Sequence, residues 1–314
     1  MQQTSLAMEI EKPNQTNTSP FICLSCQTPI QVDALTPEEE NQSFSCQNCD
    51  ATMRADHGIP ILLRNEKVIA SLIKEARSSQ RADWYEEVQD HQFTGAYRHH
   101  FKKRRAYLDK QLKKLLGDQK VATALDIGCG DGNHIDWLKT YADTVYASDY
   151  NVTRLLRAQK KVQPGNIVLA DITDYPATDE SFDLIFFNHV LEHIPEDEKA
   201  LEEVYRILKK DGILIIGVPN EGAMFSKIAY KLQPHLMETT DHVNFYTMKN
   251  LKEKALALPF ESKAEKHIGY GVPHFTADRI LRNYKILDDL FGFFGNIIVH
   301  TQSTSLYLIL RKSA

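Results

Sequence analysis

The 314-residue sequence lacks long hydrophobic runs, an apolar leader and an excess of one charge. No apolar run approaches the roughly 20 residues that a transmembrane helix needs. Residues 1–20 are polar and contain no apolar core of a secretion signal, so we expect a cytoplasmic protein without a membrane span. A net charge of −5 argues against a protein that coats nucleic acid.

Glycine, proline and cysteine are also scarce, with 14, 12 and 5 residues. So few glycines and prolines exclude a collagen-like or low-complexity composition. An odd number of cysteines in a chain without a secretion signal argues against a disulfide framework. What remains is the composition of an ordinary globular protein, 42% hydrophobic and 25% charged, and its length predicts about two domains.

Four of the five cysteines form two Cys-x-x-Cys knuckles, Cys23-Leu-Ser-Cys26 and Cys46-Gln-Asn-Cys49, with 19 residues between them. This spacing is typical of a zinc ribbon, in which a hairpin brings two pairs of thiolates to one ion. We therefore predict a structural Zn²⁺ site, because four thiolates leave no open position for catalysis. A redox pair or chance clustering is the alternative. The apolar run Ile59–Leu63 would give this small module a minimal core.

The chain is expected to divide into four segments. These are a flexible tail at 1–20, a zinc ribbon at 21–64, a helical connecting segment at 65–118 and an α/β domain at 119–314. The connecting segment ends in a strongly basic stretch, 98–114, in which Asp109 is the only acidic residue. A solvated helix face is one interpretation of this stretch, and contact with a phosphate-bearing or otherwise anionic substrate is the other.

After Gly117, short β-branched runs alternate with helical stretches. We expect helices near 133–141, 151–160 and 196–209. Buried strands that alternate with helices indicate a parallel sheet covered on both faces, so the sequence predicts a doubly wound, Rossmann-like α/β fold. The expected strands are Val121–Ile127, Thr144–Ser148, Ile167–Ala170, Phe182–Phe187 and Ile213–Val218, with later candidates at Glu261–His267 and Ser305–Leu310.

The first expected strand runs into a glycine-rich loop, Asp126-Ile-Gly-Cys-Gly-Asp-Gly132. Glycines between a strand and a helix let a ligand approach the backbone closely at the carboxyl end of the strand. The spacing differs from the Gly-x-Gly-x-x-Gly of dinucleotide-binding proteins. The Asp126 carboxylate beside the loop fits a ligand with a cationic or amino end better than it fits a pyrophosphate.

Acidic residues also follow the next two strands. Asp149 stands 19 residues after Gly130, where a carboxylate can accept hydrogen bonds from ribose hydroxyls. Asp171 follows the third strand, where it could meet an adenine amino group. Taken singly, each acid could equally be a helix cap or a solvated turn residue. Together, and with no basic residue in the glycine loop, they predict a nucleoside ligand without a phosphate.

These motifs, in this order and spacing, resemble those of class I S-adenosylmethionine-dependent methyltransferases over about residues 105–255. The resemblance rests on Asp126–Gly132, Asp149, Ala170-Asp171, Phe182–Phe187, Val190-Leu-Glu-His-Ile194 and Leu208–Leu214. The Leu-Glu-His sequence resembles that of one subgroup of the family. The resemblance implies an enzyme with S-adenosylmethionine as cofactor and a seven-stranded sheet whose last strand, Ser305–Leu310, is antiparallel.

The resemblance also implies which residues contact the cofactor. To these we add Cys129, within the loop, and Tyr150, beside Asp149. Grouped by the part of the cofactor that they would contact, the residues are Asp126, Gly128, Cys129 and Gly130 for the methionine part, Asp149 and Tyr150 for the ribose, Asp171 and Ile172 for the adenine, and Asn188 beside the sulfonium.

The candidate catalytic residues are histidines on the acceptor side. His242 lies in a segment after the fifth strand that related methyltransferases often carry near the active site, and it is the first candidate for a general base, oriented by Asp241. His189 and His193 come next. Methyl transfer to oxygen benefits from a base with a pKa near neutrality, whereas transfer to an amine or activated carbon needs only alignment of the acceptor. A structural hydrogen bond is the alternative role for His242.

A competing pattern overlaps these histidines. His189-Val-Leu-Glu-His193 matches the H-x-x-E-H sequence of one class of zinc peptidases. That site requires both histidines on one helix face. We expect His189 at the end of a strand, which argues against a peptidase.

The acceptor is the least determined part of the prediction. We favour a small-molecule acceptor of sugar, lipid-linked or secondary-metabolite type, methylated on oxygen or nitrogen. An RNA base methyltransferase that uses the ribbon and the basic stretch for RNA contact is the second interpretation. A non-catalytic cofactor-binding scaffold is the third. The aromatic-rich insertion 274–300 is interpreted as a packed helical cap, with a lid over an apolar acceptor or an oligomer contact as alternatives.

Overall fold

The computed structural model of the chain describes residues 19–32, 35–37, 39–64, 88 and 98–313. The predicted tail at 1–20 therefore lies almost wholly outside the described residues, and so does the connecting segment before residue 98, apart from residue 88. One mixed sheet of ten strands runs through the described part. None of the helices in these ranges has the length and apolarity that a membrane crossing requires.

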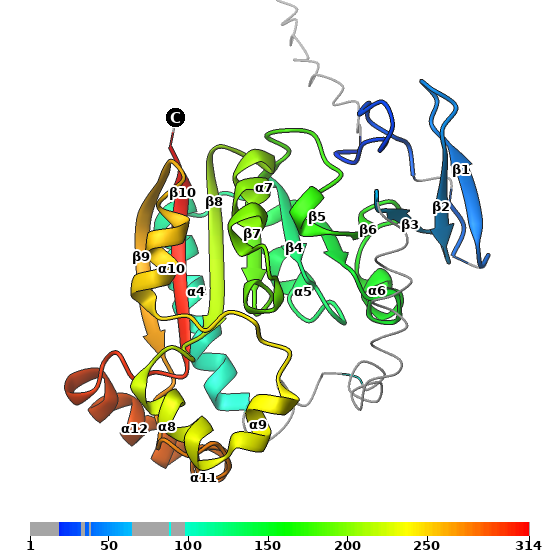
Figure 1. The fold of residues 1–314 in the computed structure, drawn as a ribbon. Helices are drawn as coiled ribbons and strands as arrows, with labels where there is room; N and C mark the ends of the chain where they lie inside the picture. Colours follow the sequence, from blue (N-terminus) through cyan, green and yellow to red (C-terminus); the bar gives the residue numbers. More distant parts are fainter. Residues whose placement is uncertain (1–18, 33–34, 38, 65–87, 89–97, 314) are drawn as a thin grey trace, which may run out of the picture.

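The centre of the sheet is a doubly wound α/β arrangement (Figure 1). Strands β6, β5, β4, β7 and β8 are parallel, and β10 lies antiparallel between β8 and β9. All seven predicted strands are present, and the predicted antiparallel last strand is confirmed. The bounds are β4 (Val121–Ile127), β5 (Ala142–Asp149), β6 (Ile167–Ala170), β7 (Phe182–Asn188), β8 (Leu208–Pro219), β9 (Phe260–Ile268) and β10 (Ser305–Lys312).

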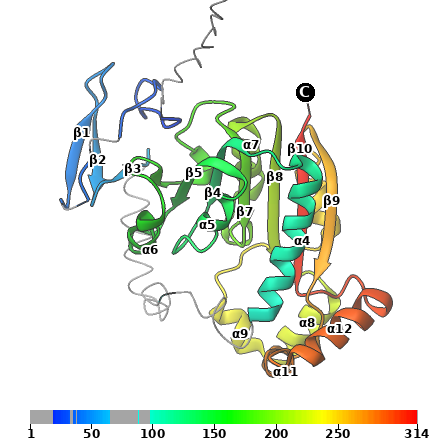
Figure 2. The same ribbon diagram turned by 180° about the vertical axis from the view of Figure 1, so that it is seen from behind.

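The strands are buried on both faces because successive side chains alternate between two hydrophobic layers. In β7, Ile185 and Phe187 belong to one layer, and Leu184 and Phe186 belong to the other. Figure 1 shows α7 (Asp197–Ile207) and α10 (Met248–Ala255) over the first layer. Figure 2 shows α4 (Arg98–Leu116) over the opposite layer.

Shorter helices complete the connections. The predicted helix at 151–160 is present as α6 (Val152–Ala158), whereas the helix predicted at 133–141 is reduced to α5 (Ile135–Leu138). The difference arises because the residues from Gly128 to His134 form the turns of the glycine-rich loop. Single 3₁₀ turns occur at η1 (Gln159–Lys161), η2 (Ile172–Asp174) and η3 (Leu191–His193).

The N-terminal cysteine-containing segment extends the sheet. Strands β1 (Gln42–Ser45), β2 (Thr52–Asp56) and β3 (Ile59–Leu62) form an antiparallel unit, and β3 pairs in parallel with β6. The apolar run expected to be the core of a small module therefore packs against the larger domain, and this pairing makes the sheet ten-stranded. Phe21 also packs edge-on against Tyr146 of β5, with ring centroids 5.8 Å apart.

Four further helices gather at the end of the sheet where β8 leads into α8 (Figure 1). They are α8 (Met224–Leu232), α9 (Pro234–Thr239), α11 (Phe275–Arg282) and α12 (Lys285–Ile298). The fully buried Arg282 of α11 ties α11 and α12 to α4, because its guanidinium contacts Asp278 and Asp288, each at 3.0 Å, and the His100 ring of α4 at 2.7 Å. The predicted helical insertion at 274–300 is thus anchored to α4 through buried charges.

Candidate functional site

The glycine-rich loop turns sharply away from the carboxyl end of β4. Gly128 has a φ of +66°, and a Cβ atom added to it would lie 2.2 Å from Cγ2 of Val190. Glycine is therefore required both by the backbone conformation and by the close approach of the neighbouring loop. The amide N–H of Gly130 donates to Oδ2 of Asp149 at 2.9 Å, which joins the loop to the end of β5.

Asp126 is a buried acid without a partner for one of its oxygens. It is 2% exposed, and its Oδ2 has no hydrogen-bond partner within the described part of the chain. Burial, helped by the nearby charge of Asp149, raises the pKa of Asp126 to about 8. An unpaired buried carboxylate is unfavourable unless a cation or donor meets it, so the arrangement fits a ligand with an amino group.

Asp149 and Asp171 hold the loops that follow β5 and β6. Both Asp149 oxygens already accept one backbone N–H, from Gly130 and from Asn151, yet each carboxylate oxygen has a second lone pair for a ribose hydroxyl. Burial raises the pKa of Asp149. Asp171 is exposed and caps the turn η2 by accepting from the backbone and hydroxyl of Thr173.

The other predicted cofactor residues differ in exposure. Tyr150 is 40% exposed beside Asp149, whereas the side chains of Ile172 and Cys129 are buried. Ile172 would therefore face a ligand chiefly with its backbone. Burial raises the pKa of the Cys129 thiol, which keeps it protonated. Asn188, at the end of β7, has a side-chain Oδ1 that is buried and has no hydrogen-bond partner among the described residues.

His189 directly follows β7 in a strained backbone conformation. Its φ is +55°, which is unfavourable for a residue other than glycine, and its backbone N–H donates to the Gly217 carbonyl at 2.7 Å. Its Nδ1 lies 3.3 Å from Oε1 of Glu192, and its Nε2 lies 3.5 Å from a nitrogen of Arg104. Both ring nitrogens therefore face protein groups, which leaves neither free to bind a peptidase zinc.

A second group of side chains surrounds His242. Its Nδ1 lies 2.6 Å from Oε2 of Glu221, and Glu221 also accepts a hydrogen bond from Tyr230 of α8. Because a carboxylate only accepts, Nδ1 carries the proton and Nε2 is left as the basic nitrogen. The expectation that Asp241 orients His242 is corrected: Asp241 lies 3.1 Å from Nδ1 of His193. Glu221 was missed because no sequence pattern connects it to His242.

The rings of His193 and His242 meet edge-on with their centroids 4.7 Å apart. Burial lowers the pKa of His193, but the hydrogen bond to Asp241 and the charges of Glu192 and Asp241 outweigh it, so the net pKa is raised. Burial raises the pKa of Glu192, but His189 and His193 outweigh it and the net pKa is lowered. These interactions favour the imidazolium form of His193 and the carboxylate form of Glu192.

Two groups of side chains have ligand atoms close enough for a metal ion. In the first, Glu192, His193 and His242 lie within 4.8 Å of one another. The raised pKa of His193 favours its protonated form, and a proton competes with a metal ion for the ring nitrogen. The second group consists of the four N-terminal cysteines, whose sulfur atoms also lie within 4.8 Å of one another.

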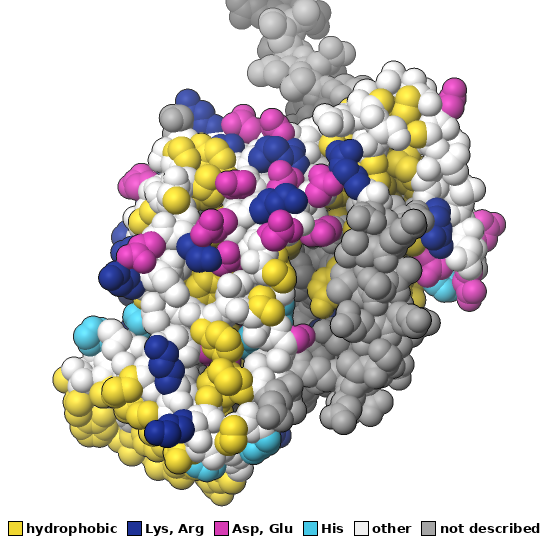
Figure 3. Space-filling view, in the orientation of Figure 1, with side chains coloured by type: hydrophobic (Ala, Val, Ile, Leu, Met, Phe, Trp, Pro, Cys, Tyr) yellow, Lys and Arg dark blue, Asp and Glu magenta, His cyan; other side chains and the backbone are white. Residues whose placement is uncertain are grey.

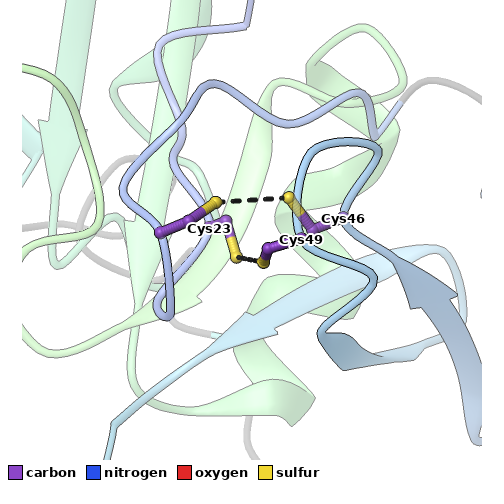
Figure 4. A group of neighbouring side chains, drawn as sticks. Cys23, Cys46 and Cys49 are labelled. Atoms are coloured by element: carbon purple, nitrogen blue, oxygen red, sulfur yellow. Dashed lines mark hydrogen bonds between the residues drawn. The ribbon is translucent and has the colours of Figure 1, made fainter.

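The cysteine geometry fits a tetrahedral ion. Sγ of Cys23 lies 3.7 Å from that of Cys49, and Sγ of Cys26 lies 3.6 Å from that of Cys46 (Figure 4). Zinc–sulfur bonds of about 2.3 Å place tetrahedral sulfurs about 3.8 Å apart, whereas a disulfide needs about 2.05 Å. Hydrogen bonds with Thr28 lower the pKa of Cys26 to about 5, whereas at Cys49 the backbone hydrogen bond of Ala51 is outweighed by the neighbouring cysteines and burial, which raise its pKa to about 12. The four sulfur atoms therefore do not all favour the thiolate unless a cation lies between them.

The basic stretch 98–114 is partly used inside the protein. Lys103 contacts Asp288 and Asp289, at 2.5 and 2.6 Å. The guanidinium of Arg104 donates to Ser305, and that of Arg105 lies 4.2 Å from the centroid of the Trp137 ring. These three cations dock α4 against the domain, whereas Lys102, Lys110, Lys113 and Lys114 are exposed.

Comparison with known proteins agrees with this geometry. Residues 125–216 match a family model described as a methyltransferase domain. The malonyl-[acyl-carrier protein] O-methyltransferase of Hamiltonella defensa is 25% identical over 154 residues, which cover 49% of this chain and 58% of that protein. The demethylmenaquinone methyltransferase of Lactobacillus johnsonii is 33% identical over 112 residues, 33% of this chain and 44% of that protein.

A solved structure shows the same fold. A candidate sarcosine dimethylglycine methyltransferase from Galdieria sulphuraria matches with a TM-score of 0.50 at 19% identity, and the match covers 67% of this chain and 86% of that one. The chain spans less than two thirds of the length of the two curated relatives above. Residues 125–216 are therefore similar to a methyltransferase domain, and the chain has the fold of the solved methyltransferase structure.

Proposed function

We propose that the protein transfers the methyl group of S-adenosylmethionine to an oxygen or nitrogen atom of a small-molecule acceptor. The observation that carries this proposal is the contact between Gly128 and Val190. It places the glycine-rich loop against the turn that carries His189 and His193, and the backbone N–H of His193 donates to the Val190 carbonyl. A cofactor loop and a cluster of candidate bases therefore share one end of the sheet.

The residues at this end suit the parts of the cofactor. Asp126, with its unpartnered oxygen, would hold the amino group, and Asp149 would accept from the ribose hydroxyls. Asp171 and the backbone of Ile172 would face the adenine. When bound, S-adenosylmethionine supplies an electrophilic methyl group on a positively charged sulfur.

His242 is the candidate general base. Its Nε2 would take the proton of an acceptor hydroxyl as that oxygen bonds to the methyl carbon, or would deprotonate an ammonium group before its nitrogen attacks. The bond between the methyl carbon and sulfur would break with its electrons going to sulfur, so that S-adenosylhomocysteine leaves, and the imidazolium that forms is stabilised by Glu221. Such a base contributes about 10²- to 10⁴-fold to a rate. Glu221 is a positioning residue, because it acts through the ring that it holds.

A small-molecule acceptor is favoured over RNA. The relatives are named for malonyl-[acyl-carrier protein] and demethylmenaquinone, and a third, from Variovorax paradoxus, for trans-aconitate. Within the basic stretch, three of the cations that could meet phosphates instead contact protein groups. His242, held by Glu221, is a candidate base that a non-catalytic cofactor-binding scaffold would not require.

The proposal is tested by calorimetric titration with S-adenosylhomocysteine, followed by methyl transfer from labelled S-adenosylmethionine to a panel of alcohols, amines and carboxylic acids. We expect cofactor binding, turnover on at least one acceptor, and loss of about 10²-fold or more in kcat for His242→Ala with unchanged cofactor affinity. Absence of cofactor binding overturns the function. Full turnover of His242→Ala overturns the assignment of the base.

We further propose that Cys23, Cys26, Cys46 and Cys49 bind one structural Zn²⁺. Sulfur spacings close to those of a tetrahedral site support this proposal. Metal analysis of the reduced protein should find one zinc per chain, and Cys46→Ser should lose it while Cys129→Ser, which lies outside the group, retains it. A wild-type protein without zinc contradicts the proposal.

A further inference from the structure

Helix α12 has an inverted distribution of polar and apolar side chains. Its solvent-facing side carries Ile286, Phe293 and Ile298, which are 76%, 62% and 71% exposed. Its inner side carries Asp288, which is 3% exposed and ion-paired with Arg282. A surface helix of a globular protein normally turns its apolar side inward, so the outward apolar side of α12 is unusual.

The neighbouring helices extend this surface. Figure 3 shows hydrophobic side chains gathered at the lower end of the molecule, over α8, α11 and α12, with cationic side chains beside them. Contiguous apolar patches of this kind mark sites of interaction with proteins or membranes. The exposed apolar face consists of Met224, Ile228 and Leu232 of α8, Ile280 of α11, Tyr284 directly before α12, and Ile286, Leu290, Phe293, Phe294, Ile297 and Ile298 of α12.

The helices are fixed with this face outward. Rotation of α12 to bury it would expose Asp288 and break its contacts with Arg282 and Lys103. Gly295 also locks the inner side, because a Cβ atom there would lie 2.2 Å from the Tyr270 ring. The exposed apolar face therefore needs a partner outside the domain.

Charge indicates which partner. Lys227 and Lys231 of α8 and Arg279 of α11 are exposed beside the face. Among the described acids of these helices, Asp278 and Asp288 are buried on Arg282, and Asp289 is paired with Lys103 and Lys285. An apolar face with exposed cations is complementary to an anionic lipid surface. In a symmetric pair of copies these cations would repel one another.

The face and the candidate active site are built on the same helix. Tyr230, on the buried side of α8, donates to Glu221, which holds His242. Its ring also packs against Phe275 of α11, with centroids 4.8 Å apart. Ile228 and Leu232 flank Tyr230 in sequence and point outward.

We propose that the exposed apolar face docks the protein on the surface of an anionic bilayer, and that the acceptor is an amphiphile whose polar group reaches His242 from that surface. The statement about the acceptor rests on the proposed methyltransferase function. The docking itself does not, because it depends only on the outer sides of α8, α11 and α12.

The test is flotation of the full chain with vesicles of phosphatidylcholine, with and without phosphatidylglycerol. We expect binding to the anionic vesicles and little to the neutral ones. Phe293→Ser combined with Ile297→Ser should weaken binding at least tenfold, and Lys227→Glu combined with Lys231→Glu should remove the preference for anionic vesicles. Leu256→Ser, an exposed apolar residue at the end of α10, is the matched control and should bind as the wild type does.

Calorimetric affinity for S-adenosylhomocysteine shows that each variant is folded and separates the two proposals. Loss of vesicle binding with intact cofactor affinity supports docking at this face. No binding of the wild type to either vesicle, or binding that the Phe293 and Ile297 changes leave intact, overturns it. A dimer in sedimentation velocity that these two changes abolish, without vesicle binding, assigns the face to a second copy and likewise overturns the proposal.

Discussion

The two halves of the candidate site are built in different ways. The cofactor half lies in short loops that directly follow β4, β5 and β6, and its residues are close together in local motifs. The acceptor half joins residues from η3, from the start of the α8 connection and from the segment before α10, such as His193, Glu221 and His242. Each loop of the first half is a local motif that follows its strand, whereas the second half joins single side chains that no local motif marks.

This difference indicates which half can change. The loop after β4 tolerates few substitutions, because Gly128 lies in close contact with Val190 and Asp126 is buried. The acceptor half consists of ion pairs and hydrogen bonds between long or rotatable side chains on irregular segments. A site divided in this way can keep the same cofactor-binding half while its acceptor-binding half changes between proteins.

The largest expected effect is a loss of cofactor affinity, caused by a substitution in the cofactor half alone. Gly128→Ala should weaken binding of S-adenosylhomocysteine by about 100-fold or more, since the added methyl group overlaps Val190 and forces the loop to move. Gly117→Ala is the matched control, because Gly117 has nearly the same φ, +65°, but no atom within 4 Å of the added Cβ. Equal calorimetric affinities for the two variants would contradict the close approach.

The next effect concerns the acceptor half. Glu221→Gln should lower kcat by about 10- to 100-fold with little change in cofactor affinity, because the His242 ring loses the carboxylate that fixes its tautomer and stabilises its positive charge. Glu221→Asp, which keeps a carboxylate, should recover part of the lost kcat, which a purely structural role would not cause. Equal losses of kcat in the Gln and Asp variants would contradict the positioning role.

A smaller effect is expected in the pH dependence of cofactor binding. Because the pKa of Asp126 is raised to about 8, its carboxyl is neutral in the cofactor-free protein at pH 6. The folded state loses stability as the pH rises from about 4 towards 8, because the carboxyl ionises more readily in the unfolded chain. Binding of an amino group requires the ionised form, so the affinity should rise by up to about tenfold per pH unit between pH 6 and 7.5. Asp126→Asn should flatten this dependence in calorimetry.

The smallest expected effect distinguishes the roles of the two carboxylates in the acceptor half, Asp241 and Glu221. Asp241→Asn should change kcat only a few-fold, because Asp241 pairs with His193 and leaves His242 on Glu221. It should also lower the pKa of His193 by removing its strongest partner, which NMR titration of the imidazole can measure. A loss of kcat as large as that of Glu221→Gln would restore the original assignment of Asp241 to His242.

The structure agrees best with the sequence-based predictions where a feature depends on residues close together in the chain. Strands such as Ile167–Ala170 and Val121–Ile127 have the predicted bounds, because buried parallel strands are continuous apolar runs. The helix expected at 133–141 is much shorter, since the turns of the glycine-rich loop extend to His134. The predicted domain boundaries, the Leu-Glu-His subgroup and the individual cofactor contacts remain predictions.

The apolar run Ile59–Leu63 illustrates what pattern alone leaves open. Its composition predicts a buried strand, but composition does not select the partner. The structure pairs β3 with β6 and thereby connects the cysteine-containing segment to the edge of the sheet nearest Asp171. Periodicity in α12 is similarly ambiguous, because an amphipathic pattern does not state which side faces inward.

The sequence by itself determined the α/β class, the positions of the seven strands, the glycine–acid loop and the four-cysteine group, since each is a local pattern with a local physical cause. Only the tertiary structure decided that Glu221 holds His242, that Asp241 pairs with His193, that β3 extends the sheet and that α12 turns its apolar side outward. These arrangements depend on contacts between segments that are distant in the chain. A local sequence pattern carries no information about the free energies of such contacts.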